Sequence, residues 1–167
     1  MIKKRRRIVK IPMEYLEAIE IAEPIFSHFF QFENGLRIAI NNFLIVCYGN
    51  DWWEKSLKVR RNDIYIYVEK VKKKQTYMPW IGDSGRVTIL PLHSITLGQL
   101  EEIVKEYKSD CIPQLFPNME FFSGRLEVIK RVRNLYAHMY PCITKKDVRV
   151  AKRDILTFCE HLNSKLP

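Results

Sequence analysis

The sequence predicts a mainly α-helical protein with a small β or loop insertion around residues 78–92. Three observations predict this fold class. Apolar residues recur at helical spacing in residues 33–48 and again in the last third of the chain. Two stretches, beginning at Thr96 and Thr144, have the pattern of a capping box, which starts a helix. With 167 residues, 47% of them apolar, the chain suits one folded domain and is too apolar for a disordered segment.

The first half of the chain contains three candidate elements. Residues 13–32 mix apolar side chains with glutamates, which favours a helix that Pro24 ends or kinks. Residues 33–48 predict a core helix that stops at Gly49. Its apolar residues at helical spacing are Leu36, Ile40, Phe43, Leu44 and Cys47. Residues 62–74 fit either a strand or a helix, because their apolar positions match both periods.

The second half has clearer start signals. After the turn and short strand expected within residues 78–92, Thr96 and Gln99 begin a helix that runs to about residue 108. A further helix follows Pro117 and Asn118 and ends at residue 138 or 139, before Pro141. The last helix starts at Thr144. Its expected buried side consists of Val148, Ile155, Phe158 and Leu162.

The net charge of +9 is unevenly distributed. Residues 1–10 carry six Lys or Arg and no acid, so the other 157 residues carry only +3. Within that remainder, residues 123–153 hold nine Lys or Arg against two acids, a net charge of +7. We therefore predict a basic tail over residues 1–11 and a single domain over residues 12–167. The stretch 123–153 suits a surface that binds a phosphate backbone, although a solvated face explains its lysines equally well.

Cysteine spacing and apolar runs point to a cytoplasmic protein. The four cysteines, at positions 47, 111, 142 and 159, lack the close pairing of a zinc site. No long apolar stretch follows the basic start, and the longest apolar run, residues 43–48, is too short to cross a bilayer. We expect reduced thiols, no metal, no cofactor and no membrane association.

The helix before Pro141 carries the candidate site. Lys130, Asn134 and His138 step by four residues, so they form one stripe of a polar arc that also contains Arg131. Arg133 lies about 60° outside this arc, and we expect its long side chain to reach across to it.

This residue set can cleave RNA without a metal. An imidazole titrates near neutral pH, so His138 can take a proton from a 2′-hydroxyl or give one to a leaving oxygen. A guanidinium such as that of Arg133 can bind a phosphate with two hydrogen bonds and stabilise the charge of the transition state. The ordinary interpretation is a solvated cationic face with His138 stabilised by the helix dipole, and spacing alone favours that interpretation.

The residues themselves resemble a known signature. Residues 129–138 read Ile-Lys-Arg-Val-Arg-Asn-Leu-Tyr-Ala-His and resemble the motif of the HEPN superfamily, which is Arg, a polar residue that is often Asn, and His after four to six intervening residues. Residues 32–37 and 48–53 are similar to the first-helix region of the Swt-like and abortive-infection branch. The similarity spans about residues 30 to 164.

The resemblance implies a helical bundle that dimerises through the motif helices. Many members of that superfamily are metal-independent RNA endonucleases in which two Arg and His sets meet in one cleft. The resemblance assigns catalysis to Arg133 and His138 and an orienting or substrate-binding role to Asn134. It also suggests that Glu33 or Arg37 projects toward the cleft. The residues expected to bind substrate are Lys130, Arg131 and Arg37.

We therefore predict an RNA endonuclease of the toxin or antiphage type. It would act as a homodimer on RNA, with any control supplied by an antitoxin or another regulatory protein. One alternative is a non-catalytic HEPN-type module that binds RNA or protein within a larger complex. Another is a structural subunit that buries the motif helix or the Trp52 and Trp53 surface against a partner.

Overall fold

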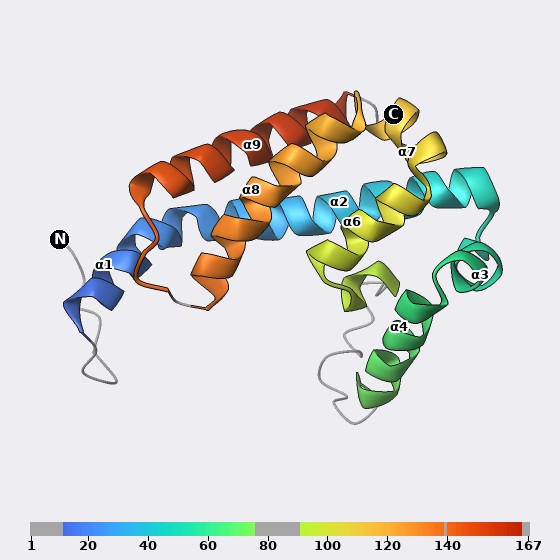
Figure 1. Cartoon of the computed structure of the whole chain (residues 1–167), viewed down its shortest axis with the longest axis horizontal. Coiled ribbons are helices and arrows are strands. Elements are labelled where there is room, and N and C mark those ends of the chain that lie inside the picture. Colours follow the sequence, from blue (N-terminus) through green and yellow to red (C-terminus); the bar gives the residue numbers. More distant parts are fainter. Residues whose placement is uncertain (1–11, 76–90, 139, 165–167) are drawn as a thin grey trace.

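The computed structural model describes residues 12–75, 91–138 and 140–164 (Figure 1). Within these ranges the regular structure is helical and no strand is present, which confirms the mainly α fold class. Most of the predicted insertion at 78–92 lies outside the described residues, and its last two residues belong to a short 3₁₀ helix, η3 (Pro91–Ser94). The predicted basic tail, residues 1–11, also lies outside them.

A long central helix, α2 (Phe26–Tyr48), organises the molecule. In Figure 1, α8 (Met119–Ala137) crosses α2, and α9 (Lys145–Asn163) lies alongside α8. Helices α6 (Leu97–Glu106) and α7 (Lys108–Leu115) also pack on α2, and α4 (Asn62–Gln75) contacts η3. The remaining elements in chain order are α1 (Met13–Ala22), η1 (Glu23–Ile25), η2 (Trp53–Leu57) and α3 (Lys58–Arg60).

The core lies where α2, α8 and α9 meet. Each helix buries apolar residues three or four positions apart, as a helix with one packed face must. Phe158 of α9 is at the centre, with the rings of Phe32 and Phe122 at centroid distances of 5.3 and 5.9 Å. On the packed side predicted for α9, Ile155, Phe158 and Leu162 are buried and Val148 is partly buried.

Pro24 was predicted to end or kink the first helix, and α1 ends at Ala22, two residues before it. Pro24 lies in the 3₁₀ turn η1 between α1 and α2, where its missing N–H costs no helical hydrogen bond. The second helix begins at Phe26, seven residues before the predicted start at residue 33. Asn34 does not interrupt it, because its side-chain amide donates to the Phe30 carbonyl (2.8 Å) and leaves the helical ladder intact.

For two other segments, the structure decides between open alternatives in one case and contradicts the prediction in the other. Residues 62–74, which fit either period, form the helix α4, with Ile64 and Val68 buried four residues apart. The helix predicted to run from Thr96 to about residue 108 instead divides at Tyr107, between α6 and α7. Tyr107 is fully buried, its hydroxyl donates to the Ser56 hydroxyl (2.9 Å), and its backbone leaves the helical conformation at φ −100° and ψ 29°.

Helix capping follows the sequence closely. The Thr96 and Thr144 side chains accept from the N–H groups of Gln99 and Asp147, which completes both predicted capping boxes. Asn118 caps α8 by accepting from the Phe121 N–H (2.7 Å). The start and end of the motif helix are therefore as predicted, within two residues.

Several features outside the motif are structural. Trp52 and Trp53 are both 2% exposed and pack edge to face at 5.4 Å, so they belong to the core. The cysteines at 47, 111, 142 and 159 are free thiols. Among the described helices, none is long and apolar enough to cross a lipid bilayer.

Candidate functional site at the end of α8

The predicted motif occupies the last turn of α8. The helix ends at Ala137, and the N–H of His138 still donates to the Asn134 carbonyl (3.0 Å). His138 and Asn134 are exposed, and the His138 ring lies 5.9 Å from the ring of Tyr140. The helix cannot continue past Pro141, which would lack the required N–H. An imidazole is therefore presented to solvent at the helix terminus.

Arg133 points away from the stripe of Asn134 and His138. Its Nε donates to Oε1 of Glu33 on α2 (3.1 Å). The reason is its place on the helix: Arg133 comes one turn after Ile129, which is fully buried, so its side chain leaves α8 on the packed side. The expectation that Arg133 reaches across to the polar arc is therefore wrong for this structure.

Glu33 joins two arginines. While Oε1 accepts from Arg133, Oε2 accepts from Nη1 and Nη2 of Arg37, both at 3.2 Å. The exposed fractions of the side chains are 15% for Glu33, 8% for Arg37 and 42% for Arg133. Arg133 is therefore held at one end by a shielded carboxylate while its guanidinium reaches solvent. Among the described residues, the two Nη groups of Arg133 have no hydrogen-bond partner.

Arg37 fastens η3 to α2. Its Nε donates to the Leu92 carbonyl (3.0 Å) and its Nη2 to the Ile95 carbonyl (3.1 Å). With the two hydrogen bonds to Glu33, each of the three guanidinium nitrogens of Arg37 donates at least one hydrogen bond. Arg37 was predicted to bind substrate, whereas in this structure its donors are engaged by the Leu92 and Ile95 carbonyls and by Glu33, so it holds η3 against α2.

Lys130 and Arg131, also predicted to bind substrate, are turned toward other helices. Nζ of Lys130 donates to Oε2 of Glu101 on α6 (2.7 Å). Nη2 of Arg131 lies 3.5 Å from Oδ1 of Asp147 in the first turn of α9, with the Arg131 side chain 63% exposed. The structure therefore does not gather the predicted set into one cluster.

The Glu101 carboxylate predicts a pH dependence of stability. Burial alone would raise the pKa of Glu101, but hydrogen bonds from Lys105 and Lys130 outweigh it and lower the pKa below the usual 4.5. Such a group stabilises the fold above its unfolded pKa, and this stabilisation is lost as the pH falls through the folded pKa. We expect Glu101→Gln to lower the free energy of unfolding at pH 7, with the difference from wild type shrinking below pH 4.5. Urea denaturation at pH 7, 5 and 3 measures this; a difference that stays constant contradicts it.

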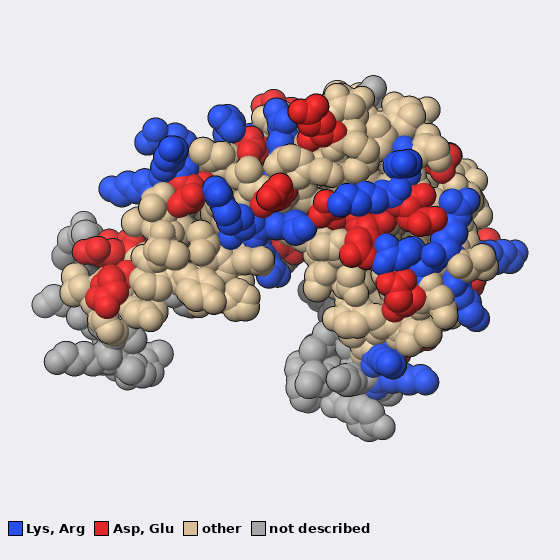
Figure 2. Space-filling view, viewed as in Figure 1, with Lys and Arg blue, Asp and Glu red and all other residues tan. Residues whose placement is uncertain are grey.

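A cleft of about 510 Å³ opens beside Arg133, between the first half of α2, η3 and the end of α8. The space-filling view is hollowed in this region (Figure 2). The described residues that line the cleft are Phe26, Phe29, Phe30, Glu33, Asn34, Arg37, His93, Ser94, Ile95, Thr96, Arg133, Tyr136 and Ala137. Arg133 and Arg37 of the predicted site are among them, and Asn134 and His138 are not.

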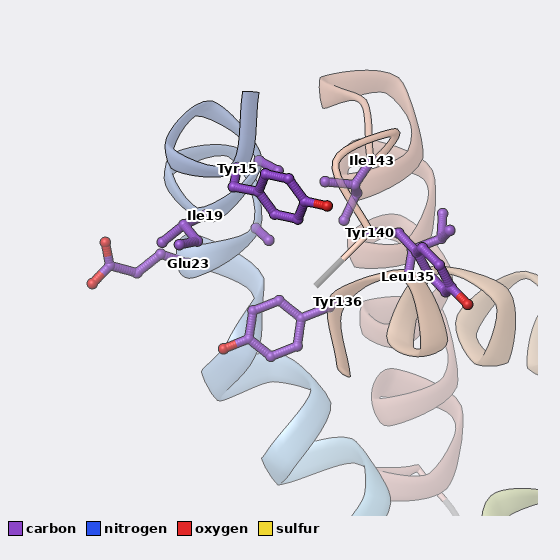
Figure 3. Close-up of a pocket in the computed structure, with 9 residues that line it drawn as sticks. Tyr15, Ile19, Glu23, Leu135, Tyr136, Tyr140 and Ile143 are labelled. Atoms are coloured by element: carbon purple, nitrogen blue, oxygen red, sulfur yellow. The ribbon is translucent and has the colours of Figure 1, made fainter. Parts of the chain in front are cut away.

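A second cleft, of about 400 Å³, lies between α1 and the end of α8 (Figure 3). Its walls come from α1, the end of α8 and the segment leading to α9. The described lining is mainly apolar and comprises Tyr15, Ala18, Ile19, Ala22, Glu23, Leu135, Tyr136, Tyr140 and Ile143. Tyr136 lines both clefts.

Sequence reasoning missed the aromatic and hydroxyl residues of the Arg133 cleft. A signal for part of them exists: Phe26, Phe30, Glu33 and Arg37 recur at intervals of three or four, which puts them along one side of a helix. No comparable signal marks Ser94 and Thr96, because they reach the cleft through tertiary packing of η3 on α2.

The described residues contain no group of three or more His, Cys, Asp or Glu arranged to hold a metal ion. No protein-family model, curated protein or solved structure matches the chain. The helical fold class is established by the structure itself, and the HEPN resemblance of residues 30–164 stays a prediction.

Proposed function

We propose that the protein is a metal-independent RNA endonuclease whose chemistry is centred on the end of α8. One observation carries this proposal. A solvent-presented imidazole and a guanidinium anchored through Nε lie within six residues of each other in the sequence, at the end of one helix. His138 supplies proton transfer, and the Nη groups of Arg133 suit a phosphate. Asn134, exposed one turn before His138, orients the substrate.

The proposed reaction is attack by the RNA on itself. His138 takes the proton of a 2′-hydroxyl, the 2′-oxygen bonds to phosphorus, and the bond from phosphorus to the 5′-oxygen breaks as that oxygen gains a proton from a second imidazole, the His138 of another copy. Arg133 stabilises the charge on the phosphoryl oxygens in the transition state. The products are a 2′,3′-cyclic phosphate and a 5′-hydroxyl.

A homodimer suits this chemistry. In-line displacement needs a base on one side of phosphorus and an acid on the other, and one imidazole serves one side at a time. Within one chain, Arg133 lines the cleft of about 510 Å³ while His138 lies outside it. We propose that two copies associate through α8, so that the His138 imidazoles of both copies flank one phosphate that Arg133 binds, one acting as base and the other as acid.

The outer face of α9 supports RNA as the substrate. Five exposed cations follow one another along its first half: Lys145, Lys146, Arg149, Lys152 and Arg153. Blue side chains mark this end of α9 in Figure 2. Cations spaced along a helix can contact successive phosphates, and such contacts make binding depend on salt. In the proposed setting the enzyme acts in the cytoplasm and is restrained by an antitoxin or another regulatory protein.

Cleavage in the presence of EDTA tests the proposal. We expect the purified full chain to cut RNA in EDTA and to leave 5′ ends that polynucleotide kinase labels without prior phosphatase treatment, because the mechanism produces 5′-hydroxyls. Cleavage that requires an added divalent metal contradicts it. Salt-dependent RNA binding without cleavage would favour the alternative, a non-catalytic RNA-binding module.

A further inference from the structure

Two phenylalanines are exposed at the rim of the Arg133 cleft. Phe26 and Phe30 lie one turn apart on α2, line the cleft, and are 53% and 64% exposed. The Phe26 ring is backed by Tyr136 at a centroid distance of 5.7 Å. Phe29, between them in sequence, is 4% exposed and packs in the core. All three phenylalanines line the cleft, but only Phe26 and Phe30 expose much of their rings, an arrangement typical of a binding surface.

The charges and polar groups beside these rings suit a nucleotide. Arg37, Glu33 and Arg133 together carry a net charge of +1, and the solvent-facing member of the three is Arg133. Amide and hydroxyl groups from Asn34, Ser94 and Thr96 line the same cleft. Its volume of about 510 Å³ is of the size that holds a small organic ligand. A flat apolar surface next to a cation is the combination that binds a base together with its phosphate.

We propose that this cleft binds one unpaired nucleotide of an RNA strand. The base stacks on Phe30 and the adjoining phosphate contacts Arg133. A base inside a duplex has both faces covered by its neighbours, so only an unstacked base can offer a face to a phenyl ring. The inference rests on the proposed function and names its substrate class, which is single-stranded or looped RNA.

The stacking contact has a direct spectroscopic test. Wild-type full-length protein is mixed with a single-stranded 2′-O-methyl RNA that contains 2-aminopurine, because this RNA lacks the attacking hydroxyl and stays intact. Stacking on Phe30 is expected to quench the 2-aminopurine fluorescence. Phe30→Leu keeps an apolar side chain but removes the aromatic face, so we expect the quenching to disappear and the dissociation constant to rise about 5- to 100-fold. Phe30→Tyr should restore both.

The control is Tyr67→Leu, which removes an aromatic ring that is 41% exposed on α4 and should change neither readout. The inference would be overturned if Phe30→Leu quenched the fluorescence as much as the wild type does. It would also be overturned if the wild-type protein bound a fully paired duplex as tightly as the single-stranded RNA. Loss of self-association by Phe30→Leu in sedimentation with unchanged RNA affinity would overturn it too, and would assign the two rings to an interface between copies. If the wild type neither binds nor cleaves RNA, the proposed function itself fails. If the wild type cleaves RNA and Phe30→Leu binds RNA as tightly as the wild type, the stacking contact is wrong and the proposed function stands.

Discussion

Replacing His138 with Ala is expected to slow RNA cleavage by about 10²- to 10⁴-fold, the usual contribution of a positioned acid or base. The fold should tolerate the change. His138 is exposed, and the hydrogen bond that it makes to Asn134 uses the backbone N–H, which Ala retains. Single-turnover cleavage rates and the midpoint of urea denaturation measure the two effects separately.

His28→Ala provides the matched control. His28 is a half-buried histidine on α2 that lines neither cleft, and its hydrogen bond to Ser27 is long, at 3.5 Å. Its removal should leave the cleavage rate at the wild-type level. A His138→Ala protein that cuts RNA as fast as His28→Ala would remove His138 from the mechanism, whatever happens to its stability.

Helix starts were predictable because their signals are local. The side chains that cap α6, α8 and α9 bond to N–H groups three residues ahead, so the pattern that starts each helix is contained in four consecutive residues. The same holds for the proline turn between α1 and α2. By contrast, the helical state of residues 62–74 depends on burial of Ile64 and Val68 against other elements, and the sequence pattern of this segment fits two periods.

The location of the candidate site was predictable, and its arrangement was not. The sequence places Arg133, Asn134 and His138 at a helix end, as the structure shows. The direction of Arg133, however, depends on Glu33, a hundred residues earlier in the chain. The role of Arg37 depends on carbonyls 55 and 58 residues later. A helical wheel describes one helix, and these contacts arise only when α8 and η3 pack on α2.

Removing Glu33 is expected to cause the largest loss of stability among the charged residues of the site. Glu33→Ala would leave Arg37, whose side chain is 8% exposed, without a counter-charge and close to a second guanidinium. Breaking a shielded ion pair in this way strands a charge. Because Arg133 is partly solvated, we expect a decrease in the free energy of unfolding of about 2–4 kcal/mol, somewhat below the range for a fully buried pair. Urea denaturation at pH 7 measures it.

Glu33→Gln separates the effect of the carboxylate charge from that of the side-chain shape. Gln keeps an acceptor for one arginine, so we expect it to lower the free energy of unfolding by about half as much as Glu33→Ala does. Glu69→Gln removes a carboxylate from an exposed pair with Lys72 on α4 and should cost less than about 0.5 kcal/mol. At a temperature where Glu33→Gln is fully folded, RNA cleavage should still fall, because the negative charge that holds Arg133 is gone and the two arginines share one acceptor. If Glu33→Ala proves as stable as Glu69→Gln, the two arginines do not depend on Glu33, and the cleft beside Arg133 is held together by the packing of α2, η3 and α8.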